Sequence, residues 1–205
     1  MIDALLLAPQ NRVLAPLSHW LVERKAGADQ ISIVGFAFGA AAVLALAWHA
    51  FGLALALLAA NRVADGLDGA VARLNGPTDR GAFLDISLDF VFYALFPLGF
   101  ALADPAANAL AAAVLIASFV GTGSSFLAFA AIAAKQGKTA AAYPAKGIYY
   151  LGGLTEGFET IVLFVMMCLW PGAFAPLAYI YAAACTLTTL LRWHQGWTAF
   201  GPRKN

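Results

Sequence analysis

The sequence predicts an all-α integral membrane protein with six transmembrane helices and both termini on the cytoplasmic side. Of its 205 residues, 62% are hydrophobic and only 11% are charged, whereas soluble domains carry about a quarter charged residues. Such a chain cannot cover a globule with polar surface, and it is too apolar to remain disordered. Its apolar runs do not alternate as barrel strands do, so helices are the expected spanning elements.

Residues 1–28 precede the first long apolar run. Pro9, Asn11, Arg12 and Pro16 interrupt this segment, so it does not resemble a secretory signal. We expect a short amphipathic juxtamembrane segment that lies on the membrane, with Trp20 as an interfacial anchor. The whole chain, 1–205, is expected to form a single membrane domain whose six-helix unit covers 31–192.

Each expected span has about the 20 residues that a bilayer requires and ends at a turn signal. The spans cover 31–51, 52–74, 82–103, 108–134, 147–169 and 174–192. They are separated, in order, by His49-Ala50-Phe51-Gly52, Asn75-Gly76-Pro77, Asp104-Pro105, Ala142-Tyr143-Pro144 and Trp170-Pro171-Gly172. The break at Gly52 is the least polar of the five.

The positive charges indicate the orientation. All twelve Lys and Arg residues lie in the termini, in the 75–81 and 135–146 loops or at adjoining span ends. With six spans these regions share one side of the membrane, and positively charged loops remain cytoplasmic. The net charge of +1 provides no basic field for nucleic acid. Cys168 and Cys185 lie inside apolar runs and suggest neither a disulfide framework nor a zinc site.

Four aspartates gather where spans two and three meet the cytoplasmic side. Asp65 and Asp68 are three residues apart, and Asp85 and Asp89 are four apart, so each pair shares one face of its helix. The two antiparallel spans bring the pairs to a similar depth. Carboxylates inside a membrane are costly and line functional cavities, and oxygen ligands suit Mg²⁺ or Mn²⁺. Structural salt bridging between helices is the alternative interpretation of this cluster.

These residues resemble the signature of the CDP-alcohol phosphatidyltransferase family. The family pattern is Asp-x-x-Asp-Gly-x-x-Ala-Arg followed by Gly-x-x-x-Asp-x-x-x-Asp. All eight of its defining residues are present here: Asp65, Asp68, Gly69, Ala72, Arg73, Gly81, Asp85 and Asp89. Within the family the chain looks like a small bacterial inner-membrane subgroup, which implies a multi-pass protein with its active site facing the cytoplasm.

The resemblance implies a role for each matched residue. Asp65, Asp68 and Asp85 would bind a divalent metal, and Asp89 would complete a second metal site, giving two Mg²⁺ or Mn²⁺ ions. Asp89 would also be the catalytic general base. The nucleotide would be contacted by Gly69, Arg73 and Thr78, and by Ser32, which is the hydroxyl that remains where many members carry Pro-Asn-x-x-Thr.

The second half of the chain is expected to select the acceptor alcohol. One helical face of the span 147–169 would carry Tyr149, Gly152, Gly153, Glu156 and either Glu159 or Thr160. Glutamates inside a membrane usually have a functional role. Lys146 would lie at the cytoplasmic mouth of the site, where it can meet an acceptor phosphate. A polar stripe that serves stability alone is the alternative interpretation.

The expected reaction is metal-dependent transfer of a phosphatidyl group from CDP-diacylglycerol to a polar alcohol, with release of CMP, in phospholipid biosynthesis. The acceptor would be glycerol 3-phosphate, inositol phosphate or a small amino alcohol, with glycerol 3-phosphate slightly favoured. CDP-choline or CDP-ethanolamine transfer to diacylglycerol is the alternative within the family. A non-enzymatic divalent-cation-binding membrane protein is the alternative outside it. Relatives suggest a homodimer surrounded by membrane lipids.

Overall fold

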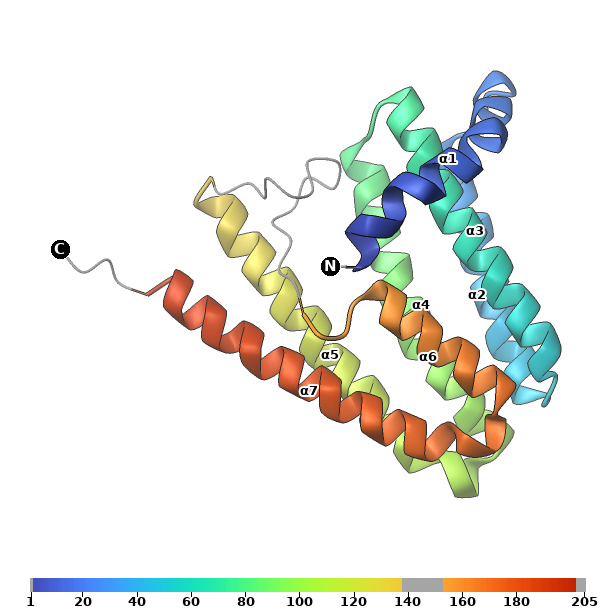
Figure 1. Ribbon diagram of the computed structural model, residues 1–205, viewed down its shortest axis with the longest axis vertical. Coiled ribbons are helices and arrows are strands. Elements are labelled where there is room, and N and C mark those ends of the chain that lie inside the picture. Colours follow the sequence, from blue (N-terminus) through green and yellow to red (C-terminus); the bar gives the residue numbers. More distant parts are fainter. Residues whose placement is uncertain (1, 138–152, 202–205) are drawn as a thin grey trace.

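The computed structural model describes residues 2–137 and 153–201, with side chains from Arg12 onward, and over these ranges the chain is all-helical (Figure 1). No strand is present in the described residues, which confirms the predicted all-α class. In chain order the helices are α1 (Ile2–Glu23), α2 (Ala28–Ala47), α3 (Phe51–Asn75), α4 (Asp79–Ala103), α5 (Pro105–Lys135), α6 (Gly157–Leu169), the 3₁₀ turn η2 (Pro171–Ala173) and α7 (Phe174–Ala199).

Among the described residues, the turn signals of the sequence coincide with helix ends, whereas Ala142-Tyr143-Pro144 lies outside the described residues. Gly76 follows α3 with φ of 93°, a left-handed value that glycine adopts without strain. Thr78 then caps α4, because its hydroxyl oxygen accepts a hydrogen bond from the Gly81 N–H at 3.0 Å. Asp104 caps α5 in the same way, accepting from the Ala107 N–H at 3.1 Å, and Pro105 is the first residue of that helix.

Four stretches in the described part of the chain are long and apolar enough to cross a membrane: Ala28–Ala47, Asp79–Ala103, Pro105–Lys135 and Pro171–Ala199. Helix α3 has sufficient length, but Arg62, Asp65, Asp68 and Arg73 interrupt its apolar character. Helix α6 is apolar but has only 13 residues. The six spans and the cytoplasmic location of both termini therefore remain predictions.

The fifth expected span differs from the structure. We expected a helix from residue 147, but α6 begins at Gly157, and residues 153–156 precede it without helical structure. The single helical face through Gly153, Glu156 and Glu159 was therefore a wrong prediction. Glycine at 153 favours an irregular backbone, and Glu159 accepts a hydrogen bond from the Glu156 N–H at 3.1 Å, which satisfies one of the donors that a helix start leaves without a partner.

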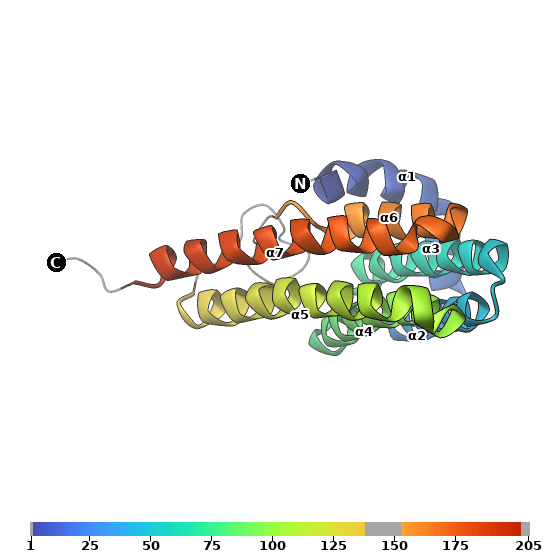
Figure 2. The same ribbon diagram turned by 90° about the horizontal axis from the view of Figure 1, so that it is seen from below.

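The helices form two neighbouring groups. Helix α2 packs closely against both α3 and α4, and α5 lies beside α7 along most of their length (Figures 1 and 2). Helix α4 also packs against α5 and so joins the groups. Helix α1 packs across α3, and α6 contacts both α3 and α7.

Aromatic side chains join the groups at the end of the bundle away from the aspartates. Phe96 of α4 stacks on Phe164 of α6 with 4.2 Å between ring centroids, and Phe100 stacks on Phe174 of α7 at 4.5 Å. All four rings are at most 1% exposed. Buried aromatic pairs of this kind contribute about 0.5–1.5 kcal/mol each beyond their area burial. This core holds α4 in register with its neighbours and so sets the position of the aspartates that it carries.

Two glycines let α2 approach the helices that carry the aspartates. A Cβ atom on Gly35 would lie 2.9 Å from the Cβ of Ala64 on α3, and one on Gly39 would lie 2.7 Å from Cδ2 of Phe92 on α4. Small residues spaced by four positions commonly allow close helix packing in membranes. The close approach places Ser32 of α2 beside the aspartates.

Replacing Gly39 with alanine is therefore expected to destabilise the protein by about 1–3 kcal/mol, the usual cost of an added carbon in a packed interior. Gly52 is a matched control, because a Cβ atom there would meet nothing within 4 Å. Gly52→Ala is expected to leave stability unchanged or slightly raised. Thermal unfolding of both variants in the same detergent measures the difference, and equal midpoints would contradict the packing argument.

Candidate active site

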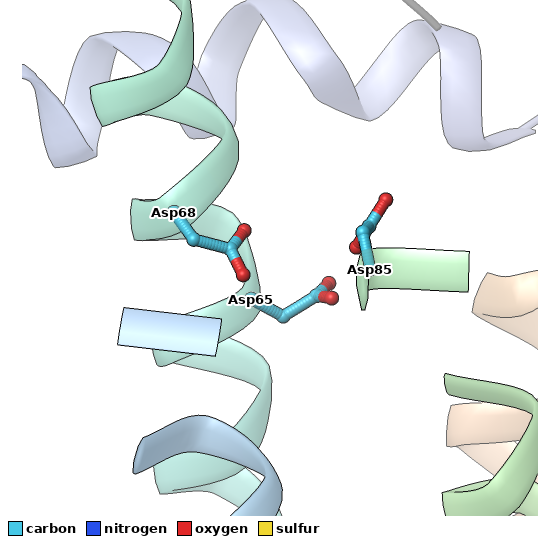
Figure 3. A group of neighbouring side chains, drawn as sticks. All are labelled: Asp65, Asp68 and Asp85. Atoms are coloured by element: carbon cyan, nitrogen blue, oxygen red, sulfur yellow. The ribbon is translucent and has the colours of Figure 1, made fainter. Parts of the chain in front are cut away.

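Two helices bring three carboxylates together. Asp65 and Asp68 lie one turn apart on α3, and Asp85 lies in the second turn of α4. Each contributes an oxygen atom, and these atoms all lie within 4.8 Å of one another. Figure 3 shows the three side chains directed into the space between the two helices. The expectation that spans two and three present their aspartates to each other is thus met for these three residues.

Helix α2 contributes the hydroxyl of Ser32. The Ser32 Oγ atom donates a hydrogen bond to Oδ2 of Asp68 at 2.5 Å, and the Asp68 residue is only 6% exposed. A hydroxyl donor stabilises a buried carboxylate and fixes its orientation. Ser32, which the sequence suggested only through its hydroxyl, therefore lies beside the carboxylate group.

Asp89 lines the same cavity, is not one of the three mutually close carboxylates, and pairs with Arg62. The Arg62 Nη2 atom donates to Oδ1 of Asp89 at 3.0 Å, and Nη1 lies 3.5 Å from Oδ2 of Asp65. The guanidinium group thus connects α3 to α4. The expected cluster of four aspartates consists of a group of three and an adjacent ion pair.

Arg62 is held by a residue that the sequence analysis missed. Its Nε atom donates to Oδ1 of Asn61 at 2.7 Å, and Nδ2 of Asn61 donates to the Gly35 carbonyl oxygen at 2.8 Å. Asn61 is 3% exposed, and the Arg62 guanidinium also lies over the ring of Phe92 at 5.2 Å. The sequence could have indicated Asn61, because it is an amide next to Arg62 inside an apolar run, and polar residues within membrane spans often mark functional positions.

These side chains line a cavity between α2, α3 and α4 that is open to solvent on one side, with about 280 Å³ of empty space including the open part. Its lining residues are Ser32, Gly35, Phe36, Asn61, Arg62, Asp65, Asp68, Asp85, Leu88, Asp89 and Phe92. Four carboxylates face one guanidinium in this lining, which leaves an excess of negative charge. Three convergent carboxylates are the hard oxygen donors that Mg²⁺ and Mn²⁺ prefer. The donor set therefore fits a divalent cation.

The expected nucleotide-binding residues follow the carboxylates toward the α3–α4 turn. A Cβ atom on Gly69 would lie 3.2 Å from Nη1 of Arg73, so the guanidinium of Arg73 lies over the bare backbone of Gly69. Thr78, at the start of α4, is occupied as the helix cap. Next to it, Arg80 pairs with Asp29 of α2 at 2.6 Å. Gly69 and Arg73 therefore share one surface, while Thr78 has a structural role at the turn.

The expected acceptor residues are only partly described. Lys146 and Tyr149 lie outside the described residues. Glu156 is 6% exposed and accepts a hydrogen bond from the Gly153 N–H at 3.0 Å, while Glu159 accepts from the Glu156 N–H. Both glutamates thus stabilise the start of α6, and neither is among the described residues that line the cavity.

Comparison with known proteins identifies similar chains. Inner membrane protein YnjF of Escherichia coli strain K12 is 56% identical over 171 residues, which is 82% of each chain. Phosphatidylinositol phosphate synthase PgsA1 of Mycobacterium tuberculosis, with CDP-DAG bound, has a TM-score of 0.76 at 20% identity, covering 95% of this chain and 98% of that one. The same synthase in complex with manganese and citrate has a TM-score of 0.74 at 20% identity, covering 93% and 91%. At this identity the structures show a shared fold.

The family comparison agrees with the geometry of the site. The model of the CDP-alcohol phosphatidyltransferase family matches residues 26–194, a range that includes the paired aspartates of α3 and α4 and every helix from α3 to α6. The match excludes the non-enzymatic alternative. The chain belongs to the CDP-alcohol phosphatidyltransferase family of enzymes.

Proposed function

We propose that the protein transfers a phosphatidyl group from CDP-diacylglycerol to a small polar alcohol and releases CMP, as a step of phospholipid biosynthesis. The observation that carries this proposal is the group of three carboxylates, Asp65, Asp68 and Asp85, beside a polar cavity between apolar helices. The family assignment supports the reaction class. The bound CDP-DAG of the structurally similar synthase supports the choice of donor.

The carboxylate group suits a pyrophosphate-binding site. Asp65, Asp68 and Asp85 would hold Mg²⁺ or Mn²⁺, which when bound neutralises the charge of the donor's pyrophosphate. The manganese complex of the similar synthase supports a divalent ion. Arg73, whose guanidinium lies over Gly69, would form charge-assisted hydrogen bonds to a phosphate. Gly69 has no side chain, so the guanidinium of Arg73 can lie close to its backbone where the nucleotide would bind, and Ser32 orients Asp68.

Asp89 is the proposed general base. It would accept the proton of the acceptor hydroxyl while the hydroxyl oxygen attacks the β-phosphorus of the donor. A new phosphorus–oxygen bond then forms to the alcohol, the bond to the bridging oxygen breaks, and CMP leaves. Asp89 suits this role because it lies one turn beyond Asp85 on the same helix and is not part of the group of three carboxylates.

The proposed location is the bacterial inner membrane, with the site facing the cytoplasm and the acyl chains of the donor in the bilayer. Large apolar side chains are exposed near the cytoplasmic ends of α3 and α4, including Leu74 at 45% and Phe83 at 68%. Such side chains suit contact with lipid. The described Lys and Arg residues favour the same orientation, and we further propose a homodimer.

Product analysis tests the function directly. Purified protein is incubated with CDP-diacylglycerol, Mg²⁺ or Mn²⁺ and a panel of alcohols, and the lipids are identified by mass spectrometry. Glycerol 3-phosphate is the first acceptor to test, followed by inositol phosphate and small amino alcohols. We expect CMP release with one acceptor and a matching phosphodiester lipid. Product formed only from CDP-choline or CDP-ethanolamine with diacylglycerol would overturn the proposed donor.

Glu156, Glu159, Lys146 and Tyr149 remain the proposed acceptor side. Glu159→Gln is expected to raise the KM for the acceptor by about 10- to 100-fold, as loss of a charged hydrogen bond would, and to leave the KM for CDP-diacylglycerol unchanged. Glutamine can still accept a hydrogen bond from the Glu156 N–H, so the start of α6 is retained. Steady-state kinetics and thermal unfolding are the measurements. Wild-type kinetics in this variant would limit Glu159 to its structural role.

A further inference from the structure

Arg62 lies between two carboxylates that come from different helices. We propose that its guanidinium replaces a second metal ion, so that the site holds one divalent cation on Asp65, Asp68 and Asp85 while Arg62 positions Asp89. The inference rests on the proposed function, which makes this cavity the reaction site. It departs from the two ions that the sequence resemblance implies.

Arg62 contacts one oxygen atom of each of the two carboxylates that a second ion would bridge. Nη2 contacts Oδ1 of Asp89 at 3.0 Å, and Nη1 lies 3.5 Å from Oδ2 of Asp65. An ion bridging Asp65 to Asp89 would have to bind carboxylates that the guanidinium already contacts. Because arginine stays protonated in proteins, the ion would also meet a fixed positive charge at close range.

Arg62 is fixed in this position by its surroundings. Its side chain is 18% exposed. Nε donates to Asn61, whose own amide donates to the Gly35 carbonyl, and the guanidinium lies over Phe92. Moving Arg62 aside for an ion would leave the buried Oδ1 of Asn61 without this donor, which is costly. The contacts of Arg62 therefore hold its guanidinium in place within the site.

The arrangement also assigns the two oxygens of Asp89. Arg62 contacts Oδ1, so Oδ2 is the oxygen that we expect to accept the acceptor proton. A cationic partner on one oxygen fixes the orientation of the carboxylate. Arg62 is thus a positioning residue that acts through Asp89.

The number of bound ions tests the inference independently of activity. Metal-free protein in detergent is equilibrated with Mn²⁺, bound manganese is counted by mass spectrometry, and the spin coupling is read by electron paramagnetic resonance. Wild type is expected to bind one uncoupled Mn²⁺ per chain. Asp68→Asn is expected to lose this ion, whereas Asp89→Asn should retain one. Two ions in wild type, with one lost in Asp89→Asn, would overturn the inference.

Variants of Arg62 add a second readout. Arg62→Met keeps an apolar stem but removes the charge, and it is expected to raise the stoichiometry from one Mn²⁺ to two, with a coupled spectrum. Arg62→Lys keeps the charge and should remain at one. If Arg62→Met does not fold, the number of bound Mn²⁺ ions in wild type, Asp68→Asn and Asp89→Asn still tests whether the site holds one ion or two. One ion in Arg62→Met would show that Arg62 does not exclude a second ion and would contradict the proposal.

The same preparation separates this inference from the proposed function. Two ions in wild type together with CMP release from CDP-diacylglycerol would overturn the role of Arg62 and leave the proposed reaction intact. One ion that disappears in Asp68→Asn, together with no CMP release for any acceptor, would support the metal assignment and overturn the proposed reaction.

Discussion

Replacing Asp68 with asparagine is expected to reduce CMP release by at least roughly 10²–10³-fold. Asp68 is buried, accepts a hydrogen bond from Ser32 and belongs to the group of three carboxylates. Loss of a metal ligand removes charge stabilisation of several kcal/mol, and each 1.36 kcal/mol changes a rate tenfold. An excess of chelator should have the same effect on the wild-type protein. The measurement is CMP release at saturating CDP-diacylglycerol with added Mg²⁺ or Mn²⁺.

Asp104→Asn is the matched control for this substitution. Asp104 caps α5 and lies at the far end of α4 from the carboxylates. Asparagine is an equally good cap, so this variant should keep wild-type turnover and stability. Full activity of Asp68→Asn, or full activity of the wild type in excess chelator, would disprove the metal-dependent mechanism.

Replacing Asp89 with asparagine is expected to lower turnover by about 10²–10⁴-fold, the typical cost of removing a general base. An amide cannot take the acceptor proton. The affinity for CDP-diacylglycerol should change little, because Asp65, Asp68 and Asp85 remain in place. Direct binding of the donor and CMP release, measured on the same preparation, separate the two effects.

The contrast between the two aspartates identifies their roles. If Asp89→Asn loses binding and turnover by the same factor, Asp89 acts chiefly as a metal ligand. If its turnover stays within a few-fold of wild type, another group takes the proton. Asp68→Asn, in comparison, is expected to lose donor binding as well as turnover, because the pyrophosphate site depends on its carboxylate.

Much of the fold could be predicted from local sequence. The expected spans 52–74, 82–103 and 108–134 lie within α3, α4 and α5, because glycine, proline and capping residues act through their own backbone or that of close neighbours. The start of α6 could not be placed in this way. The expected span ran from residue 147 through residues 153–156, whereas α6 begins only at Gly157, next to the hydrogen bonds that Glu156 and Glu159 accept from backbone N–H groups.

The candidate site also has features that the local sequence predicts and features that it does not. The spacing of Asp65 and Asp68 places them on one face of α3, and helix periodicity alone predicts this shared face. The ion pair of Asp89 does not follow from spacing. Its partner is Arg62, a residue 27 positions earlier in the chain, which in turn donates a hydrogen bond to Asn61.

The composition, the turn residues and the aspartate motif thus specify an all-α membrane enzyme and the helices that carry its carboxylates, because these properties act over one or two helical turns. Only the packing of α2 against α3 and α4 decides which carboxylates converge. The close approach at Gly35 and Gly39 brings Ser32 to Asp68 and supplies the carbonyl group that holds Asn61. Such contacts join residues far apart in the chain, and their geometry depends on how complete helices fit together.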